Sequence, residues 1–453
     1  MAKTIIVGSG PAGLIAAHTL YKEGYTDFLV LEKLDRIGGR IESYTENGYH
    51  IDVAAQLVHP GYKMAKTIIA ELGLSDHLVH STFNKLRMWD ESQQRAVFSR
   101  PLEDDPEEAA ATMKWINAMG EDNYKGFIQW ARDRCADGKM YEGEVTWGLD
   151  VDNDVLSEYV EERFGKEVLE RFAQPIMSAV SLTSPEKQST LYGLQILWTI
   201  LVGNVDVMDT GLELLVDKLM EEFGDKCKTS CEVTEIVVEK GVTKGVKTAN
   251  GDFYECENVI CCVEAPTAIK IIPAMTEPMK KAVSTVKYSK VMTVLNFTDK
   301  MPIDFDEFGT GMMFNRRSGL LFTVASFKSA KAPASVPPGK ECTSLFLFDE
   351  TADRMWDWPD EKIEEEVVKN LRKAFDFYPE TIDGYYIARY EFGNDIMPPG
   401  SATAMNEFRL NHYQDIKNLY LAGDYLFTSS YESAMYTGRR VAYAMLEKKE
   451  QLV

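Results

Sequence analysis

The sequence KTIIVGSGPAG at residues 3–13 decides the fold class of this 453-residue chain. Residues 3–7 are mostly apolar and predict a buried parallel strand, and residues 14–23 predict a helix that begins directly after the turn at residues 8–13. A strand, a glycine-rich turn and a helix in this order open a dinucleotide-binding fold. The stretch therefore predicts an α/β fold with a Rossmann-like nucleotide site near the amino end.

The glycines of this turn have separate tasks. Gly8 permits the tight turn, Gly10 lets the backbone approach a pyrophosphate, and Gly13 lets the helix pack against the strand. The helix opens with Pro11 and Ala12, so its unpaired N–H groups and the positive end of its dipole face the phosphates. All five residues are predicted to bind the cofactor.

A second strand adds the ribose contact. Residues 28–31 are apolar and end at Glu32, nineteen residues beyond Gly13, where a carboxylate can accept hydrogen bonds from a ribose diol. Glu32 is the predicted ribose anchor, and Lys33 beside it is a further predicted cofactor-binding residue. These elements alone do not distinguish NAD from FAD.

The turn after the second strand separates the two cofactors. Residues 32–40 read EKLDRIGGR, in which Gly38 and Gly39 let the backbone pass close to a cofactor and Arg40 brings a permanent charge to the pyrophosphate. This segment resembles the Glu and Gly-Gly-Arg turn of the flavin amine oxidase, protoporphyrinogen oxidase and phytoene desaturase superfamily. The resemblance implies FAD, because an NAD-only dehydrogenase has no need of the second turn.

Residues 48–57, GYHIDVAAQL, stand where this superfamily passes along the isoalloxazine ring of the flavin. Relatives often carry Gly-Gly or Gly-Pro there, whereas this chain has Ala54 and Ala55. The small side chains still accommodate a close approach. The resemblance implies cofactor contacts from Ala55, Gln56 and Leu57.

The carboxyl end carries the third part of the resemblance. Residues 418–424 read NLYLAGD and residues 431–440 read YESAMYTGRR, as in the closing strand, Gly-Asp and final helix of the superfamily. No cysteine lies near residues 397–400, where relatives attach flavin covalently, so FAD is expected to be non-covalent. The resemblance implies FAD contacts from four residues here: Gly423, Asp424, Ala434 and Met435.

The middle of the chain is expected to build a second lobe. Residues 75–204 show helical periodicity, which predicts an inserted helical cap, and β-rich segments recur between residues 288 and 395. Between these two regions, short strands separated by glycines predict hairpins, and the resemblance places one residue there, Val233, at the adenine. We predict a glutathione-reductase-type FAD-binding domain interleaved with a substrate-binding lobe of mixed sheet and helical cap. The FAD-binding domain comprises residues 1–74, 205–287 and 396–453, and the substrate-binding lobe comprises residues 75–204 and 288–395.

Composition restricts the partners and the compartment. The chain has 49 basic and 71 acidic residues, a net charge of −22, and no dense basic cluster, which excludes nucleic acid and anionic membranes as expected partners. Seven scattered cysteines fit a reducing cytoplasm, and the amino end shows no secretion signal. The apolar stretch at 191–205 is interrupted by glycine and glutamine, so no transmembrane segment is expected.

Residues around the flavin ring separate amine oxidases from other members. Monoamine oxidase relatives carry an aromatic cage and a lysine that reaches flavin N5 through water. Here the final cage tyrosine falls at Ser430, beside Tyr431, and Met292 stands where the lysine is expected, with Lys290 two residues earlier. These differences argue against amine oxidation, and Lys290, Tyr431 and Tyr425 are the candidate catalytic residues.

The predicted function is removal of a hydride from a hydrophobic or conjugated small molecule by a protoporphyrinogen oxidase-like or desaturase-like enzyme. Oxygen or another electron acceptor would then reoxidise the flavin. Three alternatives stay open: a redox-neutral isomerase that shifts a double bond of a polyene or fatty acid, an amine oxidase, and a flavoprotein without turnover. A largely apolar cleft is expected where the two lobes meet, lined in part by residues 288–297.

Overall fold

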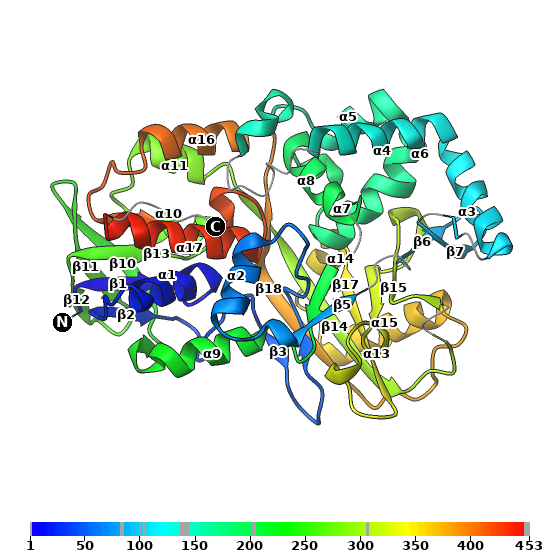
Figure 1. Ribbon diagram of the computed structural model, residues 1–453, viewed down its shortest axis with the longest axis horizontal. Helices are drawn as coiled ribbons and strands as arrows, with labels where there is room; N and C mark the ends of the chain where they lie inside the picture. Colours follow the sequence, from blue (N-terminus) through cyan, green and yellow to red (C-terminus); the bar gives the residue numbers. More distant parts are fainter. Residues whose placement is uncertain are drawn as a thin grey trace.

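The computed structural model describes residues 2–81, 86–99, 101–102, 105–135, 145–201, 205–304 and 308–447. One large group of strands lies at the left of the view and a second extends from the centre to the lower right, and a group of helices from α3 to α8 lies at the top right (Figure 1). Residues 202–204, at one predicted domain boundary, lie outside the described residues. The arrangement is mixed α/β, as predicted.

The first sheet has β1 (Thr4–Val7) at its centre. β1 pairs in parallel with β2 (Phe28–Leu31) on one side and β13 (Asn258–Cys261) on the other, and all four of its residues are buried. β19 (Leu419–Leu421) extends the sheet beyond β13, and β9 (Cys227–Lys228) extends it beyond β2. Strands from both ends of the chain thus share one parallel sheet, which confirms the Rossmann-like fold class.

Two long helices bring the chain ends together beside this sheet. α1 (Pro11–Lys22) packs along α17 (Tyr431–Met445), and both contribute to one core cluster with Ile6 of β1 (Figure 1). A Cβ atom on Gly438 would lie 2.1 Å from the carbonyl oxygen of Ala12. Only glycine therefore allows the two helices to approach this closely, and this packing holds the carboxyl end against the first glycine turn.

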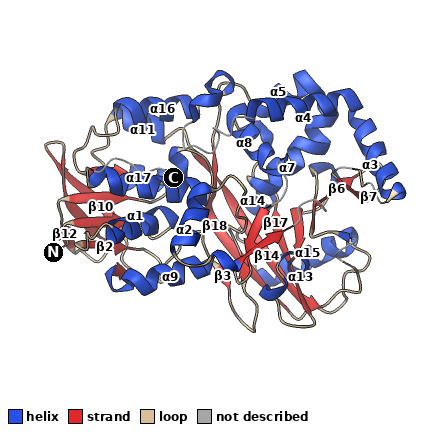
Figure 2. Ribbon diagram, in the orientation of Figure 1, coloured by secondary structure: helices blue, strands red, loops and turns tan. Residues whose placement is uncertain are grey.

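The second sheet is mixed and has seven strands (Figure 2). β14 (Lys287–Asp299) and β18 (Gly384–Ile396) form its longest pair, antiparallel, with a bulge between Ser289 and Val291. β17 (Lys340–Leu347) pairs with the other edge of β14. The remaining strands follow in spatial order: β16 (Phe322–Phe327), β15 (Gly311–Met313), β6 (Leu86–Asp90) and β7 (Arg95–Phe98).

The predicted helical cap therefore also contributes strands. β6 pairs in parallel with β15, which joins Leu86 to Gly311, and β5 (Leu78–Ser81) pairs with β8 (Val205–Met208). These short strands depend on partners far along the chain, so local periodicity does not indicate them. The helices of this region are α3 (Pro106–Met119), α4 (Glu121–Cys135), α5 (Leu156–Phe164), α6 (Lys166–Val168), α7 (Gln174–Val180) and α8 (Thr190–Leu201).

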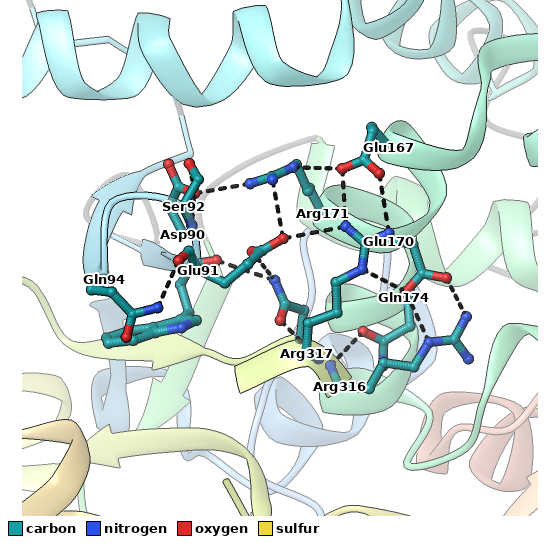
Figure 3. A network of polar contacts seen from close by, with 12 residues as sticks. Asp90, Glu91, Ser92, Gln94, Glu167, Glu170, Arg171, Gln174, Arg316 and Arg317 are labelled. Carbon is teal, nitrogen blue, oxygen red and sulfur yellow. Dashed lines mark hydrogen bonds and ion pairs between the residues drawn. The ribbon is translucent and has the colours of Figure 1, made fainter. Parts of the chain in front are cut away.

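A polar network ties the cap to the mixed sheet (Figure 3). Nη1 of Arg171 lies 2.8 Å from Oδ1 of Asp90, at the end of β6, and Nε of Arg171 lies 2.8 Å from Oε2 of Glu167. Arg317, which follows β15, reaches the same Glu167 at 2.9 Å. The shared carboxylates hold the β6–β7 hairpin, the cap and the β15–β16 connection in one fixed arrangement.

No helix in the described ranges is long and apolar enough to cross a membrane.

The other elements complete the two lobes. The remaining strands are β3 (Ser43–Tyr44), β4 (Ile51–Asp52), β10 (Val233–Glu239), β11 (Val242–Thr248) and β12 (Phe253–Glu255). The helices are α2 (Lys63–Glu71), α9 (Glu213–Phe223), α10 (Ala265–Ile271), α11 (Glu277–Val283), α13 (Lys328–Lys331), α14 (Asp349–Met355), α15 (Asp360–Ala374) and α16 (Ser401–Asn411).

Candidate active site

The first glycine turn keeps open space above one of its glycines. Gly8 has a φ of 96°, and a Cβ atom on Gly13 would lie 1.9 Å from the carbonyl oxygen of Gly8. Both positions need glycine for the turn itself. A Cβ atom on Gly10, in contrast, would meet nothing within 4 Å. The turn thus leaves room beside the N-terminus of α1, and a pyrophosphate fits this space.

The second glycine turn lies directly on the first. The N–H of Gly38 donates to the carbonyl oxygen of Ser9 at 3.1 Å, and a Cβ atom on Gly39 would lie 2.9 Å from Cα of Gly10. Glu32 reaches the same point, since its Oε2 accepts hydrogen bonds from the N–H and the hydroxyl of Ser9 at 2.8 and 2.7 Å. The structure therefore brings the three predicted nucleotide-binding elements together.

Arg40 stands between two carboxylates. Its Nη2 donates to both oxygens of Asp424 at 3.0 and 2.8 Å, and its Nη1 donates to the carbonyl oxygen of Gly393 at 3.0 Å. Asp395, which is fully buried, lies 3.5 Å from the same guanidinium. Burial raises the pKa of Asp395 well above its usual range, and the neighbouring charge of Asp424 adds to the rise. Arg40 therefore joins the amino-terminal turn to the carboxyl-terminal Gly-Asp.

The remaining predicted cofactor contacts lie around these turns in different environments. Val233 is buried in the core cluster of the first sheet, and Gly423 lies two residues beyond the end of β19. Ala434 lines the cavity described below, whereas Met435 is buried in the core cluster of α1 and α17. Lys33 is exposed. Their contacts with FAD stay predictions.

A cavity of about 250 Å³ adjoins Pro11 and Arg40 and extends into the second lobe. The nucleotide side of its wall includes Ala55, Leu57 and Ala434, from two of the predicted segments. The opposite side is formed by cap and sheet residues with largely apolar side chains, as expected for the junction of the two lobes. These apolar residues are Ala179, Val180, Leu182, Val291, Met313, Val324 and Phe346.

Tyr431 is the predicted catalytic residue that lines this cavity. Its hydroxyl donates to the carbonyl oxygen of Leu57 at 2.8 Å. Its ring meets that of Tyr62 edge to face, with centroids 5.2 Å apart and an interplanar angle of 87°. The hydrogen bond joins α17 to the stretch expected along the flavin ring, so Tyr431 has a fixed position at the centre of the site.

Lys290 and Tyr425 lie outside the cavity wall, which corrects their expected placement. Lys290 lies 3.9 Å from Asp353, with its ammonium 4.9 Å from the ring centroid of Trp356, whereas the next residue, Val291, lines the cavity. Successive strand residues point to opposite faces, so one position decides the side. Tyr425 is buried in the core beside the first sheet. Neither residue is a candidate for substrate contact in this geometry.

Sequence analysis missed two lysines at the cavity. Lys331 lines its wall, and the ammonium of Lys328 donates to Oε1 of Gln56 at 2.7 Å. A spacing of three residues places two side chains on one face of a short helix. Such a pair in a polar stretch is ordinarily exposed, so no local pattern indicates its burial.

Known proteins share this architecture. The family described as flavin containing amine oxidoreductase matches residues 11–446. Coproporphyrinogen III oxidase of Bacillus subtilis (strain 168) is 22% identical and covers 96% of this chain and 92% of its own. Protoporphyrinogen oxidase 1, chloroplastic, of Spinacia oleracea is 22% identical over 82% of this chain and 70% of its own. The structure of cyclohexylamine oxidase from Brevibacterium oxydans IH-35A matches with a TM-score of 0.72 and 17% identity, covering 98% and 99% of the two chains.

Proposed function

The chain belongs to the flavin containing amine oxidoreductase family and is an FAD-dependent oxidoreductase, and we propose that it takes a hydride from a hydrophobic or conjugated small molecule. The coproporphyrinogen and protoporphyrinogen oxidases among its relatives support this class of substrate. FAD supplies the acceptor for two electrons and a proton, and the protein orients both partners and excludes water.

The apolar wall of the cavity carries the proposal. Aliphatic and aromatic side chains favour a substrate that buries much nonpolar surface, and they outnumber the polar side chains of Thr310, Ser326, Lys331, Tyr390 and Asn394. Gly393, Ser430 and Asp424 also line the cavity. Tyr62 and Tyr431 meet edge to face, so they do not offer two facing rings to an ammonium. This combination favours a bulky apolar substrate over a simple charged amine.

The residues of the two glycine turns fit the cofactor. The space at Gly10 and the N–H groups at the start of α1 would hold the pyrophosphate, and Glu32 would accept from the ribose. Arg40, fixed by Asp424, adds a positive charge at the same edge of the cavity. Leu57 and Ala434 would then border the flavin ring, with Tyr431 between the ring and the substrate lobe.

Anaerobic mixing of the FAD-loaded protein with candidate substrates tests the proposal. Coproporphyrinogen III, protoporphyrinogen or a polyene should bleach the flavin absorption, and putrescine and cyclohexylamine should not. Admission of oxygen then tests whether oxygen is the acceptor. Bleaching by the amines alone would contradict the proposal in favour of an amine oxidase. Product formation without net electron transfer would indicate an isomerase, and no bleaching by any substrate would leave a flavoprotein without turnover.

A further inference from the structure

The ammonium groups of a buried lysine, Lys328, and a half-buried lysine, Lys331, converge on one amide oxygen at the edge of the cavity. Lys328 and Lys331 belong to the short helix α13, directly after β16. Nζ of Lys328 lies 2.7 Å and Nζ of Lys331 lies 3.3 Å from Oε1 of Gln56. The Nε2 of Gln56 donates to the carbonyl oxygen of Asp52 at 3.1 Å, which fixes the orientation of the amide. The amide oxygen is therefore held toward both lysines.

Neither ammonium has an ion pair within the described part of the chain. The nearby Asp52 uses Oδ1 for the Ser43 hydroxyl at 2.7 Å and for the N–H of Leu212 at 2.8 Å. Glu341, the other nearby carboxylate, accepts the N–H of Ser329 at 3.0 Å. Asp52 and Glu341 favour the charged lysines from nearby, but neither makes an ion pair with them, so a ligand anion would supply a direct partner that the protein does not.

The two lysines differ in access to the cavity. Lys328 is 5% exposed and lies behind Gln56, whereas Lys331 is part of the cavity wall. Burial lowers the pKa of Lys328, and burial together with the charge of Lys328 lowers the pKa of Lys331 well below its usual range. An anion next to Lys331 would reverse this shift, because an opposite charge favours the protonated ammonium.

We propose that Lys331 binds a carboxylate of the substrate, with Lys328 and Gln56 as positioning residues that hold it at the cavity wall. The inference rests on the proposed function, because it takes the apolar cavity as the substrate site, and it adds that the hydrophobic substrate is an acid. The apolar wall would bury the body of such a molecule while the ammonium neutralises its one charged end. This arrangement also orients the molecule, since only one end finds a cation.

The chemistry of the site decides against a base role. A neutral lysine acting as a general base would leave the cavity without a cation at this end and would favour a substrate without a carboxylate. The positive charges of Lys328 and Lys331 both attract an anion. Without an anion, the charge of Lys328 disfavours protonation of Lys331. A carboxylate at the cavity wall pairs with Lys331 and lies in the field of Lys328 behind Gln56, so we place it here.

Calorimetric titration of the FAD-loaded protein with three matched probes tests the subsite without requiring turnover. The probes are decanoate, methyl decanoate and decylamine, which share one alkyl chain and differ in the charge of the end group. Decanoate should bind at least tenfold more tightly than either of the others. Lys331→Gln should weaken decanoate binding at least tenfold and leave methyl decanoate unchanged, and Lys331→Arg should retain most of the affinity for decanoate.

Lys340→Gln is the matched control, because Lys340 lies in the same lobe but pairs with Asp299 and Asp383 away from the cavity. FAD content and melting temperature establish that each variant is folded. Equal binding of decanoate and its methyl ester, tighter binding of decylamine, or full decanoate affinity in Lys331→Gln would each overturn the inference. If decanoate binds as expected and no substrate bleaches the flavin, the proposed oxidation fails and the subsite stands. If substrates bleach the flavin but decanoate binding does not depend on Lys331, the proposed oxidation stands and the carboxylate subsite fails.

Discussion

The nucleotide end and the lysine end of the cavity are built in different ways. At the nucleotide end, Gly8, Gly10 and Gly13 act through the backbone, and their spacing in one short segment determines the space they leave. At the lysine end, Gln56 and Lys331 come from segments far apart and act through side chains. A cofactor shared by a family can therefore be bound by a fixed local pattern, whereas the substrate side depends on which residues the fold brings together.

The largest expected effect separates two glycines of one turn. Gly13→Ala should destabilise the protein by at least about 3 kcal/mol, because the new methyl group meets a backbone oxygen that cannot move away. Gly10→Ala should leave the stability of the apoprotein within about 0.5 kcal/mol, because its methyl group enters open space, yet weaken FAD binding at least tenfold. Urea unfolding and FAD titration measure both. Equal stability of the two variants would contradict the geometry of the turn.

Arg40→Ala should have the second largest effect on stability and on FAD retention. Its removal leaves the buried Asp424 without its cation, which we expect to cost roughly 3 kcal/mol of unfolding free energy. FAD retention through gel filtration should also fall in Arg40→Ala and in Glu32→Ala. Glu167→Ala, in the cap, is the control. Retention equal to that of the control in both variants would refute the placement of Glu32 and Arg40 at the cofactor.

The junction between α17 and α2 should give a pH dependence. Glu432 is buried and accepts the N–H groups of Met64 and Ala65 at 2.8 and 2.7 Å, and burial raises its pKa from 4.5 to about 7. Because the folded state holds this proton more tightly than the unfolded state, the contribution of Glu432 to stability falls as pH rises between about 4.5 and 7. Relative to the wild type, Glu432→Gln should gain roughly 2 kcal/mol between about pH 5 and about pH 8.

Denaturant unfolding at several pH values measures this difference directly. A stability difference between Glu432→Gln and the wild type that does not change with pH would show that the pKa of Glu432 is the same in the folded and unfolded states. At the lysine end, the Lys331 variants are compared with the wild type by their affinity for decanoate, as described above.

The smallest expected effect lies in the polar network of the cap. Arg317→Ala should lower the unfolding free energy by less than about 1 kcal/mol, because its side chain is 30% exposed and that of Glu167 is 38% exposed. Arg171→Ala, which leaves the fully buried Asp90 unpaired, is the matched contrast and should cost several times more. Equal losses in the two variants would mean that burial does not determine the strength of this network.

The parts that sequence analysis identified are those with local causes. The strand, turn and helix around Gly10 need only one another, so the Rossmann-like fold follows from spacing in the first forty residues. FAD follows from the resemblance of the Gly-Gly-Arg turn at Arg40 and the closing Gly-Asp at Asp424 to those of the flavin superfamily. Lys290 was assigned to the wrong face because a strand residue changes sides with a shift of one position. Lys331 was missed because its burial depends on Gln56, far earlier in the chain.

A structure of the protein with FAD and decanoate tests the central claim most directly, since it shows whether cofactor and acidic substrate meet in this cavity. The account predicts the flavin ring between Leu57 and Ala434, the alkyl chain along the apolar wall, and the carboxylate within about 3.2 Å of Nζ of Lys331. A flavin ring elsewhere, or decanoate bound with its carboxylate away from Lys331, would contradict it.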